Sequence, residues 1–330
     1  MNTQHAKSPC CRATIQRFGK RRRRCRQCHK TWRIRKKKRG RKLKRTNEQL
    51  IVSYLQKRSP PLRVSAHQKD RSKSSLQREL SRSLKKYTKE HGKDWLGLLK
   101  HRDKLVAVAD AIWYRVHGQK YTIYIILLRP LNIGQAVICP PMIIAGHEGL
   151  PGWKAAFDAL PANLKARIAA VVCDGAGSLV ALIKSHGWIV QRCHFHLIAA
   201  VQNYLTTGPR SLNRKYACEV MKIVQKFLVS CIPEPFLQRL EVVRRLSRSM
   251  GLRRVLGGLI SNHADYHSYR KYPELHLPAT SNSAESCIQC IRDLMYRCRG
   301  FRSLTALQHW LAAVVIFKST IRCNGKDQPN

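Results

Sequence analysis

Acidic residues are scarce in this chain of 330 residues, which has 18 Asp and Glu against 63 Lys and Arg. The formal net charge is +45 at pH 7, and no acidic residue precedes Glu48. A chain with so few carboxylates attracts polyanions. We expect nucleic acid as the partner, because Lys and Arg neutralise phosphates and release their counterions. An anionic membrane surface is the alternative.

Long apolar runs are also missing. No segment reaches the roughly 18 uninterrupted apolar residues of a spanning helix, and the N-terminus lacks the apolar core of a signal peptide. We therefore expect no membrane contact and a cytoplasmic location. The 13 cysteines are an odd number, and Cys139, Cys173 and Cys231 lie inside apolar segments. This pattern favours free thiols over disulfides.

The N-terminal segment is strongly basic, with 17 Lys and Arg among the 26 residues of 20–45. It cannot form a packed core by itself, so it needs a metal, a phosphate backbone or both. Two of its cysteines have the Cys-x-x-Cys spacing of a zinc knuckle, and two adjacent cysteines precede them. The sequence predicts a zinc site with Cys11, Cys25 and Cys28 as ligands, completed by Cys10, His5 or a water. A disordered basic arm is the alternative.

The next region, 46–95, changes to helical patterns. One pattern covers 46–55 and ends before Ser59-Pro60-Pro61, and a second, basic one covers 74–87. A helix, a proline-containing turn and a basic helix are compatible with a helix-turn-helix, in which the second helix enters the major groove. The alternative is a basic linker with transient helices.

From residue 96 the chain has the patterns of a globular domain. Strands are predicted at 105–109, 121–128, 135–138, 168–173 and 188–191, and helices at 153–160 and 178–185. This order predicts a mixed α/β (α+β) sheet covered by helices. No strand pattern follows His196 until the end of the chain, so we expect an all-α insertion at about 197–280. Two further helices are predicted at 283–297 and 304–317.

Two carboxylates follow predicted core strands. Asp110 comes directly after the first strand and Asp174 directly after 168–173, with Asp103 as a competitor for the first position. Side chains at neighbouring strand ends can converge, and a pair of Mg²⁺ ions needs converging carboxylates. The structural alternative is an ordinary Asp-Gly turn at Asp174-Gly175.

Glu285 is the third candidate, at the start of a predicted helix. Arg292 and Arg299 follow at i+7 and i+14, so one helix face combines a possible metal ligand with cations that could hold phosphates. The alternatives are a capping box formed with Asn282 and a stripe of solvated arginines.

The motifs in this half of the chain resemble those of Mutator-like transposases, in their bacterial insertion-sequence branch. The resemblance extends over about 105–318. It rests on four segments in order: Val172-Cys173-Asp174-Gly175, Val190-Gln191-Arg192-Cys193-His194-Phe195-His196, Asn282-Ser283-Ala284-Glu285 and Arg297-Cys298-Arg299-Gly300-Phe301.

The resemblance implies an RNase H-like catalytic domain with the triad Asp110, Asp174 and Glu285, which binds two Mg²⁺ or Mn²⁺ ions. It also implies that Cys193 and His196 are the Cys-x-x-His pair of the family. Such enzymes cut the 3′ end of an element, and the freed 3′-OH attacks target DNA. Their N-terminal zinc ribbon begins with Cys-Pro-x-Cys, whereas this chain has Ser8-Pro9-Cys10-Cys11.

The predicted organisation is therefore a zinc-ribbon-like segment at 1–45, a helix-turn-helix region at 46–95 and a catalytic domain at 96–330. We expect a transposase that binds the terminal inverted repeats and the target as double-stranded DNA, and that acts as a homodimer or higher oligomer. The alternatives are a catalytically silent DNA-binding protein and an RNase H-like nuclease or resolvase. The expected DNA-contacting residues are Arg21, Arg22, Arg23, Arg24, Trp32, Lys36, Lys37, Lys38, Arg78, Arg82, Arg292 and Arg299.

Overall fold

The computed structural model describes residues 8, 10–18, 22–33, 48–56, 64, 67, 72–100, 104–131, 134–206, 214–298, 300–301 and 303–323. The chain forms two compact units, Met1–Asn47 and Glu48–Asn330. Several residues named from the sequence lie outside the described residues, namely Arg21, Lys36, Lys37, Lys38, Asp103 and Arg299.

The N-terminal unit contains a small antiparallel sheet of three strands in the order β1-β2-β3. Its strands are β1 (Ile15–Arg17), β2 (Arg22–Cys25) and β3 (Thr31–Arg33). Cys25 at the end of β2 is buried, and so is Ser8, which precedes the sheet. A sheet of this size buries too little apolar surface to be stable alone, so it needs a cross-link such as a metal.

The larger unit is built on a mixed sheet of seven strands. They are β4 (Leu105–Val116), β5 (Gln119–Pro130), β6 (Gln135–Ile138), β7 (Met142–Ala145), β8 (Ile168–Cys173), β9 (Ile189–Arg192) and β10 (Thr320–Arg322). The order is β10-β6-β5-β4-β8-β9, and β7 pairs with β5. The pairs β4–β8 and β8–β9 are parallel, and the others are antiparallel.

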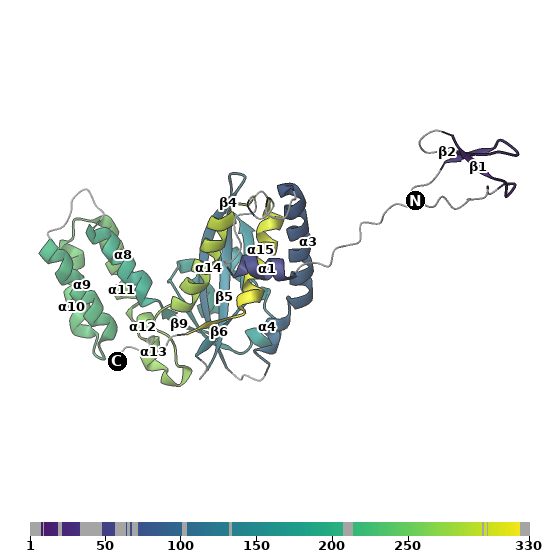
Figure 1. The fold of residues 1–330 in the computed structure, drawn as a ribbon. Coiled ribbons are helices and arrows are strands. Elements are labelled where there is room, and N and C mark those ends of the chain that lie inside the picture. Colours follow the sequence, from purple (N-terminus) through teal and green to yellow (C-terminus); the bar gives the residue numbers. More distant parts are fainter. Residues whose placement is uncertain are drawn as a thin grey trace. The chain divides into compact units, whose positions relative to one another are not determined.

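Helices cover both faces of this sheet, because apolar side chains point alternately to either side of the central strands (Figure 1). In β4, Val106, Val108 and Ile112 belong to one core, and Leu105, Ala107 and Ala109 to the other. The first core includes α1 (Glu48–Leu55), α3 (Lys73–His91), α14 (Asn282–Cys298) and α15 (Leu304–Lys318). The second includes α5 (Leu150–Asp158), α6 (Ala162–Lys165) and α7 (Gly177–Ser185), with α4 (Asp94–Gly97) at its margin.

Helices α1 and α3 thus share a core with the sheet. Leu76, Leu80 and Leu84 of α3 are buried in that core, and α3 packs against α15. Its opposite side carries exposed cations, among them Arg78 and Arg82. Most residues between α1 and α3 lie outside the described part of the chain, so the helix-turn-helix stays a prediction.

Between β9 and α14 the chain is helical, as the lack of strand patterns predicted. The helices are α8 (His194–Thr206), α9 (Arg214–Val229), α10 (Glu234–Leu246), α11 (Met250–Ser261), α12 (His263–Tyr266) and α13 (Ser268–Lys271), followed by the 3-10 helix η1 (Pro273–Leu275). Helices α8 to α12 bury a separate apolar core (Figure 1). This segment, 194–275, is called the helical insertion below.

The predicted mixed α/β fold is confirmed, but individual strands differ from the prediction. β4 has 12 residues, so Asp110 lies inside the strand and not after it. β7 and β10 were not predicted, and the 3 residues of β10 are too few for a strand pattern to stand out. Among the helices that the structure describes, none is long and apolar enough to cross a membrane.

Candidate metal centre

Asp110 lies in β4 and is 7% exposed. By strand alternation its side chain is on the face of Val108 and Ile112, where α14 packs. Oδ1 accepts a hydrogen bond from the backbone N–H of Ala111 (2.7 Å), whereas Oδ2 is buried without a hydrogen-bond partner among the described residues. Burial raises the pKa of Asp110 to about 7. An orphaned, buried carboxylate oxygen indicates a position for a cation.

His196 and Glu285 complete a three-residue cluster with Asp110. His196 is in the first turn of α8 and Glu285 in the first turn of α14. Nε2 of His196 is 3.3 Å from Oε1 of Glu285 and 3.9 Å from Oδ2 of Asp110. One ligand atom from each of the three residues lies within 4.8 Å of the others, so the cluster could hold a metal ion.

The donor set of this cluster restricts the choice of metal. Two carboxylates suit Mg²⁺ or Mn²⁺, whereas an imidazole nitrogen is a ligand for transition metals more than for Mg²⁺. The hydrogen bond with Cys193 and the nearby carboxylates raise the pKa of His196 to about 9. Without a metal, the imidazolium therefore neutralises part of the carboxylate charge, and a bound cation would take over that role.

Asp174 lies at the same edge of the sheet but is not in this cluster of described residues. It follows β8, the parallel neighbour of β4, and its Oδ1 accepts a hydrogen bond from the backbone N–H of Ala176 (2.9 Å). Its charge contributes to the raised pKa of both Asp110 and His196. The structure thus brings together two of the three predicted carboxylates, places the third nearby, and adds His196.

Cys193 connects the two helices that carry His196 and Glu285. Its buried Sγ lies 3.2 Å from the backbone nitrogen and 3.2 Å from Oγ of Ser281, just before α14. Nδ1 of His196 is 3.4 Å from the same hydroxyl. Burial alone would raise the pKa of Cys193, but hydrogen bonds from His196 and Ser281 lower it overall. The Cys-x-x-His pair therefore helps to position the cluster.

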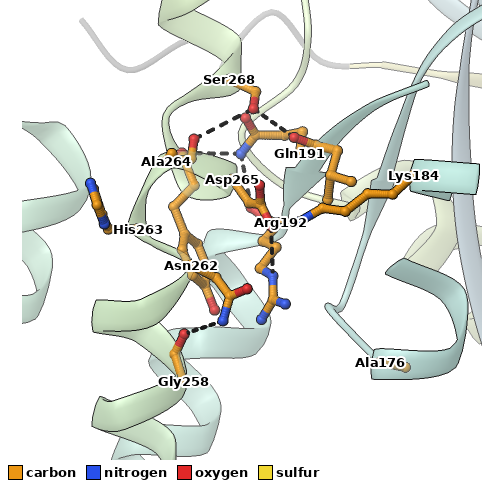
Figure 2. A network of polar contacts seen from close by, with 12 residues as sticks. Ala176, Lys184, Gln191, Arg192, Gly258, Asn262, His263, Ala264, Asp265 and Ser268 are labelled. Carbon is orange, nitrogen blue, oxygen red and sulfur yellow. Dashed lines mark hydrogen bonds and ion pairs between the residues drawn. The ribbon is translucent and has the colours of Figure 1, made fainter. Parts of the chain in front are cut away.

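Sequence reasoning did not assign a role to Gln191, which fastens the helical insertion to the sheet (Figure 2). Gln191 is 0% exposed; its Nε2 donates to the carbonyl of Tyr266 (3.2 Å), and its Oε1 accepts from the backbone N–H of Tyr269 (2.8 Å). Ser268 Oγ donates to the carbonyl of Val190 (2.6 Å). The sequence does contain a hint of this role, because Gln191 is a polar residue inside the predicted core strand 188–191.

Arg192 links the same network to the loop after β8. Its Nε is 3.5 Å from Oδ2 of Asp265, which Lys184 also approaches at 3.5 Å (Figure 2). Gly175 has φ +93°, and a Cβ there would lie 3.1 Å from Nη1 of Arg192. The positive φ favours glycine beside Asp174, and any larger residue would also have to shift the Arg192 side chain slightly.

The four N-terminal cysteines form a second cluster, as the knuckle spacing predicted. One sulfur from each of Cys10, Cys11, Cys25 and Cys28 lies within 4.8 Å of the others, and the described cysteines are all free thiols. Hydrogen bonds from the Cys28 backbone and from Ser8 lower the pKa of Cys25 to about 6, whereas bonding to Cys28 raises the pKa of Cys11 to about 12. Four crowded thiols of this kind could hold a metal ion.

Ser8 occupies an inner position beside this cluster. Its Oγ lies 3.3 Å from Sγ of Cys25 and accepts hydrogen bonds from the backbone N–H groups of Cys11 (3.3 Å) and Ala13 (3.1 Å). Ser8 therefore contacts the loop around the cluster and one of its sulfurs. Cys10 supplies the fourth sulfur of the cluster.

The described cationic candidates lie on both units. Arg22, Arg23 and Arg24 form most of β2, and Trp32 is the cross-strand partner of Arg23. In the larger unit, Nη1 of Arg292 is 3.9 Å from Oε2 of Glu285. Arg292 is therefore beside the three-residue cluster.

Comparison with known proteins gives no assignment. No protein-family model matches the chain, and no curated protein matches it.

Proposed function

We propose that this chain is a DNA transposase of the Mutator-like, insertion-sequence type, which cleaves and transfers DNA strands with divalent metal ions. The observation that carries the proposal is the cluster of Asp110, His196 and Glu285 beside the C-terminal end of β8, which Asp174 follows. A cluster of carboxylates is unusual in a chain of charge +45. It combines a metal-binding site with a general attraction for phosphates.

Some residues of the site would bind the metal ion, and others would position the DNA. Asp110 and Glu285 would hold a metal ion, His196 would be a further ligand or a proton carrier beside it, and Asp174 would complete the carboxylate set when DNA is bound. Arg292, 3.9 Å from Glu285, would bind a phosphate oxygen of the DNA. Divalent ions, when bound, supply charge neutralisation at the phosphate and activation of the attacking oxygen.

The finer assignments of fold belong to the same proposal. The mixed sheet with helices on both faces, interrupted by a helical insertion before the helix that carries Glu285, supports an RNase H-like catalytic domain. The four clustered cysteines on a three-stranded sheet support a zinc ribbon. Its row of arginines on β2, together with Arg78 and Arg82 on α3, would bind the DNA ends.

The test is cleavage of a DNA duplex that includes the sequences flanking the coding region, in Mg²⁺ or Mn²⁺. We expect cleavage by the unmodified protein and a loss of at least about 100-fold in Asp110→Asn, Asp174→Asn and Glu285→Gln, with DNA binding retained. Glu219→Gln, an exposed carboxylate that pairs with Lys222, is the matched control and should cleave normally. DNA binding without cleavage by every form would instead support a catalytically silent DNA-binding protein.

A further inference from the structure

The hairpin formed by β4 and β5 extends well past the metal centre. β4 continues for six residues after Asp110, to Val116, and β5 returns from Gln119. The two-residue turn between them, His117-Gly118, has positive φ at both positions (51° and 79°), as a tight turn that matches the twist of the strands requires. This extension gives the sheet a rigid arm beside the candidate site.

Trp113 is the exposed large hydrophobic side chain of the described part of this arm, at 62%. It lies three residues after Asp110, about 10 Å along the strand. Its neighbours Ile112 and Tyr114 face the core that contains α14, so strand alternation places Trp113 on the opposite face. There it follows Ala111, which packs at the margin of the second core.

Two cations contact the Trp113 indole. Nζ of Lys120 lies 5.2 Å and Cζ of Arg115 lies 6.0 Å from the ring centroid. Arg115 and Lys120 are cross-strand partners, two positions nearer the turn than the pair of Trp113 and Thr122. Lys120 is held in turn by Nδ1 of His147 at 2.9 Å. The indole therefore has cations on its turn side and still exposes most of its surface.

This arrangement offers two kinds of contact at once. An exposed indole is a surface for stacking planar groups, and neighbouring Lys and Arg side chains bind phosphates. Contacts between a cation and an aromatic ring at an exposed site stabilise a fold only weakly. An exposed indole flanked by two cations therefore suits a ligand that combines a planar ring with phosphates.

We propose that Trp113 is a stacking platform for an unpaired nucleobase, and that Arg115 and Lys120 bind the adjoining phosphates. The ligand class is single-stranded DNA, because a base within a duplex does not present its face. The proposal goes beyond the proposed function, because Trp113 and Asp110 lie on opposite faces of the sheet. The platform would therefore hold an unpaired base away from the metal centre.

The test uses the full-length, zinc-loaded protein and two labelled probes, a thymidine 12-mer and a 12-mer whose central residues are abasic. The two probes have the same phosphates, so the ratio of their affinities isolates base stacking. We expect the unmodified protein to prefer the thymidine probe, and Trp113→Ala to weaken that probe about 5- to 100-fold with little change for the abasic one. Trp113→Tyr should keep most of the preference.

Controls separate this inference from the catalytic one. Leu246→Ala removes another exposed apolar side chain, 72% exposed on α10, and should keep the preference. Lys120→Gln should weaken both probes alike. A Trp113→Ala variant with an unchanged ratio of affinities overturns the platform, whatever the duplex cleavage assay shows. Absence of duplex cleavage by the unmodified protein overturns the transposase proposal and leaves the probe ratio as an independent result.

Discussion

Asp110 in the metal-centre cluster and Ser8 beside the cysteine cluster are both buried, but they differ in how many hydrogen-bond partners they have. Oδ2 of Asp110 is buried and, within the described residues, has no hydrogen-bond partner. Ser8, by contrast, uses its hydroxyl for three contacts around the cysteine cluster. Asp110 therefore has a free oxygen for a cation, whereas the hydroxyl of Ser8 is already used in contacts around the cysteine cluster.

The role of Cys10 as the fourth sulfur ligand can be tested directly. We expect Cys10→Ser to lower the cobalt or zinc affinity of the protein by at least about 10-fold, because three thiolates and a hydroxyl bind these metals more weakly than four thiolates. Cys218→Ser, an exposed free thiol on α9, should have no effect. Metal titration followed by the cobalt–thiolate absorption measures both. Equal affinity of Cys10→Ser and the unmodified protein would exclude Cys10 as a ligand.

Among the secondary-structure elements, β9 carries the strongest connection to the helical insertion, through Gln191. We expect Gln191→Leu to lower the free energy of unfolding by about 1–3 kcal/mol, because it leaves the Tyr269 N–H without its partner and removes one of the two hydrogen bonds to the Tyr266 carbonyl. Urea unfolding measures this loss. Gln77→Leu, at an exposed position of α3, should change stability by less than about 0.5 kcal/mol. Equal losses in both variants would refute the anchoring role.

The contact between α9 and the end of α12 should depend on pH. His267 is half-buried, with its Nε2 3.0 Å from the carbonyl of Phe227, and burial lowers its pKa below the ordinary value of 6.5, helped by Arg270 and His263. Below pH 6.5 the unfolded chain therefore binds a proton that the folded chain does not, and stability falls as the pH decreases.

Replacing His267 with Gln should remove this contribution. We expect the stability difference between pH 8 and pH 5.5 to be smaller in His267→Gln than in the unmodified protein, as measured by urea unfolding at each pH. The same loss of stability in both proteins would show that His267 does not titrate in this way.

These elements also show what the sequence could predict. Strand ends pointed to Asp174, and a helix start pointed to Glu285, because both positions follow from local patterns. Asp110 was selected for the wrong reason, since it lies inside a strand that continues to Val116. The end of β4 was placed too early because the uninterrupted apolar run stops at Ala109. The residues from Asp110 to Val116 mix polar and apolar types and show no clear strand pattern.

The role of His196 required tertiary structure. It lies 89 residues before Glu285 in the sequence, and only the return of the chain after the helical insertion brings α8 and α14 together. A signal was nevertheless present, because α8 begins where β9 ends, at the same edge as Asp174. Because His196 follows a strand end, as Asp174 does, the same reasoning from sequence could have placed it in the site.

For the molecule as a whole, the charge of +45 predicts binding to DNA that weakens steeply with salt. If α3 contacts phosphates, the double variant Arg78→Gln/Arg82→Gln should reduce the slope of log K against log salt concentration by about 2. Both side chains lie on the exposed side of α3, whose other side packs on α15. Anisotropy titrations of a duplex at several salt concentrations measure the slope.

Arg244→Gln/Arg245→Gln is the matched control, because it removes the same charge from arginines that are paired with Glu241 at 2.6 and 2.8 Å. Its slope should stay close to that of the unmodified protein. A larger reduction in the control than in the α3 variant would place the DNA contacts on the helical insertion instead.

Binding of Mn²⁺ to the zinc-loaded protein, followed by electron paramagnetic resonance, shows whether Asp110, His196 and Glu285 form a divalent metal site. We predict saturable Mn²⁺ binding that is weakened at least about 10-fold in Asp110→Asn and in Glu285→Gln and is unchanged in Glu219→Gln. Equal Mn²⁺ binding by all four proteins, or none by the unmodified one, would show that these three residues do not form such a site.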